Sequence, residues 1–183
     1  MTAPRKQTAV QTRERLLEAA VQTLQRHGVR ALTLDSVARE AGVSKGGLLH
    51  HFPSKDALSE AVLKQLFDAF EARVRHLHEA QAPAPGRWLR AYVRATFDED
   101  PLPLELATML LVAVAENRDL LELIRDDARR WQQRLLSDGV PAPRAAVVRQ
   151  AADAYWTERL IGIAPDPEAR HEVMRELLRL THD

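Results

Sequence analysis

The sequence contains no cysteine among its 183 residues. This excludes disulfide bonds, a thiolate nucleophile and cysteine-ligated metal, and it fits a reducing compartment such as the cytoplasm. The longest apolar run, "LATMLLVAVA" at residues 106–115, holds ten residues, whereas a membrane-spanning helix needs about 20. Polar residues near Met1 interrupt any signal-peptide pattern. We therefore expect a soluble cytoplasmic protein that does not interact with membranes.

Recognisable catalytic motifs are also missing. The sequence has no nucleophile motif, no glycine-rich phosphate loop after a strand and no HExxH zinc motif. Its acidic clusters at residues 98–100 and 126–127 are explained as solvated charge. The histidine pair at residues 50–51 lacks the further ligands that a metal site needs. We expect no enzyme activity, no catalytic residues, no cofactor and no metal ion.

The charges are unevenly distributed although the net charge is zero. Residues 1–55 contain nine Lys or Arg and four Asp or Glu, a net charge of +5, so the remaining residues carry −5. A basic N-terminal part favours a polyanionic partner for that part alone. Ordinary scatter of charges over solvated helix faces explains the same count.

Apolar residues recur at helical spacing near the N-terminus, and strand patterns are almost absent. Leu16, Leu17, Ala20 and Leu24 predict a first helix over about 9–27. Thr33 is a good N-cap for a short second helix over about 34–41, and Ser44 is one for a third helix that Pro53 ends. Two short helices joined by a glycine turn, resting on a longer helix, predict a helix-turn-helix unit.

The rest of the chain is also predicted to be helical. A long fourth helix begins at Lys55, and breakers rich in proline and glycine separate the later helices, expected at about 87–98, 103–115, 118–137, 142–163 and 167–181. The predicted fold is all-α with about nine helices, divided into a three-helix head at residues 1–54 and a larger helical body at residues 55–183.

Two adjacent glycines, Gly46 and Gly47, open the third predicted helix in "GVSKGGLLHHFPSKDAL" at residues 42–58. A glycine inside a helix costs about 1 kcal/mol relative to alanine, so the pair marks a place where side chains are excluded. Either a partner approaches the backbone closely there, or the glycines relieve crowding against the first helix.

The segment "TLDSVAREAGVSKGGLLHHFPSKDAL" resembles the DNA-binding signature of the TetR family of one-component transcriptional regulators. The resemblance covers about residues 10–60 and combines the helix spacing with Gly42, Ser44-Lys45-Gly46, His51-Phe52 and Ser54-Lys55. It implies that the third helix enters the major groove of DNA. It also implies a homodimeric regulator, most simply a repressor, which binds a palindromic operator and releases it when a small molecule occupies the body.

The resemblance also assigns roles to individual residues of the head. It makes Ser44 a cap and DNA contact, and it places Lys45, Gly46 and Gly47 nearest the bases or phosphates. Other members often carry a phosphate-binding aromatic residue at the position of Leu49, and a leucine there favours contact with a thymine methyl group. His50 is open to contact with a base, a phosphate or water. The expected phosphate-backbone contacts are Thr33, Leu34, His51 and Lys55.

The body is expected to hold the effector and to form the dimer. An effector pocket is predicted to be largely apolar, for an apolar or aromatic small molecule. Ordinary core packing is the alternative for each candidate lining residue: Trp88, Tyr92, Phe97, Met109, Trp131, Trp156 and Arg159. The last two helices, at about 142–181, have more apolar surface than one core face requires, which favours dimerisation through them. A protein-interaction module, or a regulator without ligand control, remains the alternative.

Overall fold

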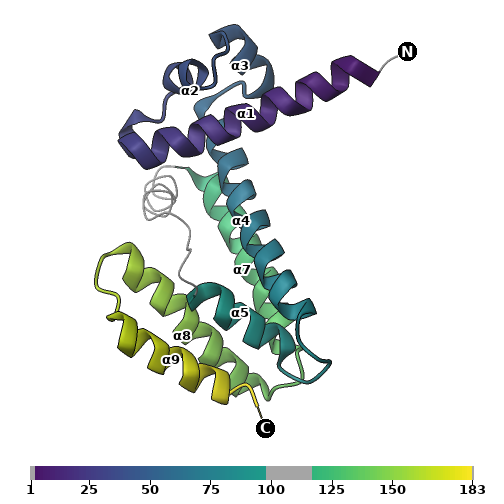
Figure 1. Ribbon diagram of the computed structural model, residues 1–183, viewed down its shortest axis with the longest axis vertical. Helices are drawn as coiled ribbons and strands as arrows, with labels where there is room; N and C mark the ends of the chain where they lie inside the picture. Colours follow the sequence, from purple (N-terminus) through teal and green to yellow (C-terminus); the bar gives the residue numbers. More distant parts are fainter. Residues whose placement is uncertain (1–2, 98–116, 183) are drawn as a thin grey trace. The chain divides into compact units, whose positions relative to one another are not determined.

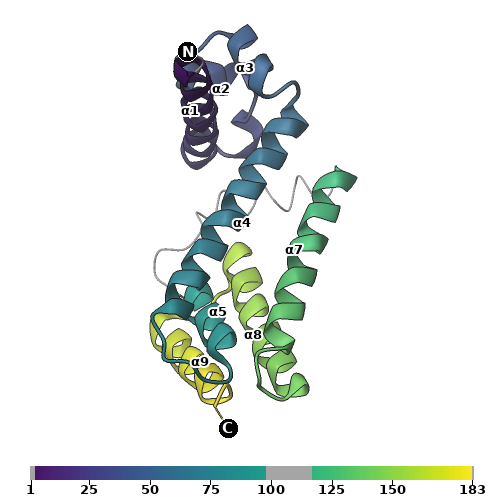
Figure 2. The same ribbon diagram turned by 90° about the vertical axis from the view of Figure 1, so that its right-hand side faces the viewer.

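A computed structural model describes residues 3–97 and 117–182 (Figures 1 and 2). Within these ranges the chain forms eight α-helices and no strand, which confirms the predicted all-α class. The predicted helix at 103–115 lies outside the described residues. No helix within the described ranges is long and apolar enough to cross a membrane. The helices are α1 (Ala3–His27), α2 (Leu34–Glu40), α3 (Lys45–His51), α4 (Lys55–Glu79), α5 (Arg87–Phe97), α7 (Arg118–Leu136), α8 (Ala142–Leu160) and α9 (Pro167–Arg179).

The chain divides into two compact units. Among the described residues, the first unit runs to Leu66 and includes residues 117–120, and the second contains residues 67–97 and 121–182. The division therefore falls inside α4. We place the functional boundary earlier, at residue 55 where α4 begins, and that boundary stays a prediction.

Helix α1 begins earlier than the sequence pattern predicted. It starts at Ala3 rather than near residue 9, so Arg5 and Lys6 lie within the helix. Pro4 is compatible with this start because the first turn of a helix does not use its backbone N–H groups as donors within the helix. The first glycine of the sequence, Gly28, follows directly after the end of α1.

The first unit is built around the contacts of α2 with α1 and with α3 (Figure 1). Its core includes Leu16 and Leu24 of α1, Val37 of α2 and Leu48 of α3, all fully buried. The guanidinium of Arg15 donates a hydrogen bond of 2.7 Å to the carbonyl oxygen of Ala41, just after α2. This bond ties the long helix to the turn that leads into α3.

The turn between α2 and α3 is formed as the sequence predicted. Gly42 has a φ of +66°, a left-handed conformation that side chains disfavour. Ser44 then caps α3, its Oγ accepting a hydrogen bond of 3.1 Å from the backbone N–H of Gly47. Thr33 caps α2 in the same way, accepting from Ser36. Together these local bonds set where α3 starts.

In the second unit, α5 packs against both α8 and α9 (Figure 2). Leu89 and Val93 of α5 are fully buried, and so are the small residues Ala145 and Ala152 of α8. Alanines at these positions let two helix backbones approach closely. On α9, Leu177 is buried in the same core cluster. Most residues of α5, including the consecutive residues 89–93, are buried, so α5 is covered on nearly all sides and is the central helix of this unit.

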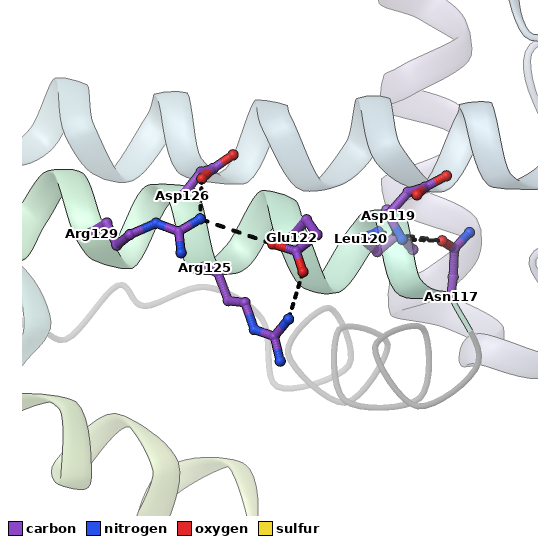
Figure 3. A network of polar contacts seen from close by, with 7 residues as sticks. All are labelled: Asn117, Asp119, Leu120, Glu122, Arg125, Asp126 and Arg129. Atoms are coloured by element: carbon purple, nitrogen blue, oxygen red, sulfur yellow. Dashed lines mark hydrogen bonds and ion pairs between the residues drawn. The ribbon is translucent and has the colours of Figure 1, made fainter.

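Helix α7 begins with a side-chain cap (Figure 3). The Oδ1 atom of Asn117 accepts hydrogen bonds of 2.9 Å from the N–H of Asp119 and 3.3 Å from that of Leu120. These bonds satisfy two of the donors that a helix start leaves unpaired. The cap explains why the helix starts at Arg118, as the sequence predicted.

Ion pairs on α7 show which of its acids are solvated. Asp126 pairs with Arg129 on the exposed face, next to the pair between Glu122 and Arg125 (Figure 3). The explanation of Asp126 as solvated charge therefore holds, and such exposed pairs contribute little to stability. For Asp127 it is wrong, because its side chain is only 15% exposed and pairs with Arg130. Burial raises the pKa of Asp127 even though Arg130 opposes the shift.

Candidate nucleic-acid interface

Helix α3 has one buried and one exposed face. Leu48 is fully buried and anchors the helix to the first unit. Lys45, Gly46, Leu49 and His50 are exposed. Lys45 and Leu49 are four residues apart, as are Gly46 and His50, so the four residues share one face of the helix. This outward face of α3 contains five of the ten predicted DNA contacts when Ser44, its exposed cap, is included.

Leu49 is an unusual surface residue in this unit because it is a large apolar side chain that is 39% exposed. Beside it, the rings of His50 and His51 lie edge to face with centroids 5.4 Å apart. His51 is half-buried, so it presents less surface than His50. The three side chains of the outward face thus offer a cation, an apolar group and an imidazole around Gly46.

The two glycines of α3 differ in their surroundings. A Cβ atom at Gly46 meets no atom within 4 Å, whereas one at Gly47 lies 3.3 Å from the Oγ of Ser44. Neither position is crowded by α1, so relief of crowding against the first helix is wrong as an explanation. Gly47 leaves room for the cap of its own helix. The fold leaves the absence of a side chain at Gly46 unexplained, which points to an external partner.

The remaining predicted contacts lie at the starts of α2 and α4. The hydroxyl of Thr33 is exposed but already bonded within its cap to Ser36, and Leu34 is half-buried. Lys55 is exposed at the first position of α4. Ser54 caps that helix, accepting a bond of 3.0 Å from the N–H of Ala57.

One residue of this surface was missed by the sequence analysis. The carboxylate of Asp35, at the start of α2, pairs with the ammonium of Lys45, with N···O distances of 3.0 and 3.1 Å. The pair joins the starts of α2 and α3. Its partners are ten residues apart on two helices separated by a turn, so periodicity within one helix does not relate them and gave no signal.

Several positive charges of the N-terminal part serve the fold itself. Arg15 bonds to Ala41, Arg26 pairs with Glu40 at 2.8 Å, and the guanidinium of Arg13 lies 5.2 Å from the centre of the Phe52 ring. The net charge of +5 therefore overstates the cations available to a partner. In the described part of the chain, no three His, Asp or Glu side chains converge as a metal site.

Two family comparisons cover most of the chain. Residues 16–62 match the bacterial regulatory proteins of the tetR family, and residues 86–182 match the tetracyclin repressor-like C-terminal domain. The chain belongs to the TetR family. As the sequence predicted, it is a DNA-binding transcriptional regulator with an N-terminal helix-turn-helix, and it is not an enzyme.

Similar proteins include transcriptional regulators of the same family. The regulator BetI of Paraburkholderia phytofirmans is 31% identical over 180 residues, covering 92% of each chain. The regulator RutR of Escherichia coli is 36% identical over 93 residues, which cover 51% of this chain and 43% of RutR. The similarity to BetI therefore extends through both units.

Solved structures share the fold at lower identity. A transcriptional regulator from Rhodococcus sp. Rha1 has a TM-score of 0.75 at 24% identity, with 92% of this chain and 95% of that one covered. The multidrug binding protein EbrR, solved with malachite green, has a TM-score of 0.66 at 22% identity over 93% and 98% of the two chains.

The predicted effector residues of this TetR-family chain do not form one group. Tyr92 and Trp131 are buried and contact each other and Phe70, with ring centroids 5.2 to 5.7 Å apart. Phe97 is also buried but stacks on Tyr155, with centroids 4.1 Å apart. The sequence analysis did not identify Phe70 or Tyr155 as partners of these residues.

The hydroxyl of Tyr92 connects the aromatic cluster to a partly exposed acid. It donates a hydrogen bond of 2.6 Å to Asp153 of α8. Burial, reinforced by the charge of Asp153, holds the pKa of Tyr92 well above its ordinary value. Burial also raises the pKa of Asp153, against the effects of the Tyr92 hydrogen bond and of Arg149. This arrangement places one polar pair beside the aromatic cluster.

The other candidate effector residues lie elsewhere in the second unit. The half-buried Trp88 stacks on His78 at 3.8 Å, and Arg134 lies over its ring at 4.7 Å. Trp156 and Arg159 are half-buried on α8, and Met109 lies outside the described residues. Two shallow hollows on the described surface are lined by charged side chains of α9 and of α4, and neither touches a candidate.

Proposed function

We propose that the protein is a homodimeric repressor that binds a palindromic operator through α3 and releases it when a small molecule binds the body. The observation that carries the proposal is the outward face of α3. It exposes Lys45, Leu49 and His50 around an unobstructed Gly46 on a helix anchored by Leu48. Such a face suits a recognition helix, which must bring its backbone close to the base edges of the major groove.

The proposed contacts fall into two kinds. Lys45, Gly46, Gly47, Leu49 and His50 face the groove, where base edges carry the sequence information. The backbone contacts, which fix the register of the protein on the duplex, are Thr33, Leu34, Ser44, His51 and Lys55. In this proposal DNA is the partner of residues 1–54. The proposed site of action is the cytoplasm.

Lys55→Ala is expected to weaken binding to all duplexes by a similar factor. The lost phosphate contact is expected to lower the slope of log affinity against log salt by roughly one unit. The measurement uses duplexes enriched by the wild-type protein from a random-sequence pool, with a scrambled duplex of equal composition. Lys64→Ala, on the same helix and paired with Glu60, is the matched control. A slope equal to that of the control would remove Lys55 from the contacts, and a wild-type protein that enriched no sequence would refute the proposed interface.

The proposed dimer uses α8 and α9, at about residues 142–181. Val147 of α8 is 56% exposed and Val173 of α9 is 42% exposed, and Ile161 and Ile163 after α8 are more exposed still. A symmetric pair of such surfaces presents two copies of α3 to half-sites related by the same two-fold axis. The palindrome follows from this symmetry.

Val147→Glu is expected to convert the dimer to a monomer, because it introduces a charge into an apolar interface on both subunits at once. The molar mass measured by light scattering is expected to fall by half at micromolar concentration. Val10→Glu is the control, since Val10 is exposed to the same extent at 57% but lies on α1. A mass that stayed dimeric in Val147→Glu would place the interface elsewhere.

The proposed effector is an apolar or aromatic small molecule. EbrR, which shares the fold, was solved with malachite green and with imidazole, which supports a small-molecule site in the body. In this chain the aromatic cluster of Phe70, Tyr92 and Trp131 offers such a site if the cluster opens. The test is to screen a compound library for molecules that release the enriched duplex and also bind the free protein. If no compound does both, a regulator without ligand control is favoured.

A further inference from the structure

The pair formed by Asp35 and Lys45 contributes a negative charge to the proposed DNA surface. Both side chains are exposed, Lys45 by 58% and Asp35 by 65%. The ammonium nitrogen of Lys45 lies within 3.1 Å of both carboxylate oxygens. A carboxylate beside Lys45 opposes phosphate binding, so phosphate binding alone does not explain its presence on this surface.

Stability of the fold does not account for the pair. Exposed ion pairs contribute little to the free energy of unfolding because solvent screens both charges. Residues 33–55 contain one other acid, Glu40, and it pairs with Arg26 of α1. Asp35 instead pairs with the first residue of α3, on the proposed recognition helix.

We propose that Asp35 is a specificity-determining residue, which holds Lys45 for contact with a guanine in the operator and keeps it from neutralising phosphates of other sequences. The proposal rests on the proposed DNA interface and deepens it. A lysine ammonium has three donors. The carboxylate of Asp35 occupies one side of the ammonium, and the donors on the other side remain for an acceptor in the groove, where guanine offers O6 and N7.

The same carboxylate disfavours binding to sequences without that guanine. On such sequences Lys45 contributes to binding only by turning to a phosphate, and Asp35 is then left without its partner among negative charges. Like charges brought together in an interface oppose binding and so increase discrimination between partners. Asp35 therefore lowers the affinity for non-specific DNA more than the affinity for the operator.

Asp35→Asn tests this proposal. With the negative charge removed, Lys45 is free to reach phosphates, so the salt slope on a scrambled duplex is expected to rise by roughly one unit. The ratio of operator affinity to scrambled-duplex affinity is expected to fall about fivefold, the lower end of what one good base contact contributes. Enrichment from a random-sequence pool is expected to lose its preference at one G·C pair in each half-site. Asp35→Ala, which removes the acceptor altogether, is expected to shift all three quantities in the same direction.

Two comparisons make the result specific to the pair. Glu40→Gln breaks the other acid–base pair of α2, and it is expected to leave both the salt slope and the enriched sequence unchanged. Lys45→Ala is expected to lose the same G·C preference, and adding Asp35→Asn to it is expected to change the preference no further. The proposal is overturned if Asp35→Asn behaves like Glu40→Gln, or if the Asp35 and Lys45 substitutions act at different base pairs. A wild-type protein that enriched no sequence would instead refute the interface itself.

Discussion

Gly46→Glu is expected to reduce operator affinity by more than about 100-fold while the protein becomes slightly more stable. The new side chain enters a space that is empty in the free protein, because a Cβ atom at Gly46 has no neighbour within 4 Å. In the proposed complex the same space faces DNA, and a carboxylate there would meet phosphates and base edges at a cost of several kcal/mol. Replacing a helical glycine stabilises the helix by roughly 0.5–1 kcal/mol, and a negative charge in the first turn is favourable.

The opposite signs of these two effects make the experiment informative. Urea unfolding measures stability, and titration of the enriched duplex measures affinity. Gly46→Ala is the matched control, with a similar gain in stability from helix propensity and a much smaller loss of affinity. Operator binding by Gly46→Glu at the wild-type concentration would show that α3 does not approach DNA by this face, whatever the stability result.

Gly86→Ala is expected to destabilise the second unit by at least about 2–3 kcal/mol. Gly86 precedes α5 with a φ of +77°, which strains any residue with a Cβ atom. That atom would also lie 2.5 Å from the carbonyl oxygen of Thr181, 2.8 Å from the guanidinium of Arg90 and 2.9 Å from Val140. The buried Arg90 hydrogen-bonds to Pro85, Thr181 and Gln81, so the clash falls on the group that holds the C-terminal end of the chain.

Gly162→Ala separates the two causes of this loss. Gly162 has nearly the same φ, +75°, but a Cβ atom there meets nothing within 4 Å. Its replacement is expected to cost only the backbone strain, about 1–2 kcal/mol. Urea unfolding of both variants gives the difference between their free energies of unfolding. Equal losses of stability would show that the groups around Gly86 move aside at no energetic cost.

The sequence alone determined the positions of most helices and the helix-turn-helix of residues 1–54. Thr33, Ser44 and Gly42 act locally, through bonds and backbone preferences that span a few residues, so the starts of α2 and α3 were predictable. The body helices in the described ranges also lie within a few residues of their predicted bounds. The start of α1 was the exception, since apolar spacing marks where a helix packs and not how far it extends beyond the packed part.

Only the tertiary structure decided which distant residues meet. The pairing of Asp35 with Lys45, the bond from Arg15 to Ala41 and the stacking of Phe97 on Tyr155 join residues ten to 58 positions apart. The packing of helices decided which aromatic residues of the body became neighbours, and it divided the predicted effector residues among separate clusters. Helical periodicity gives the face on which a residue lies, but the partner across that face depends on the angle and depth at which another helix packs against it.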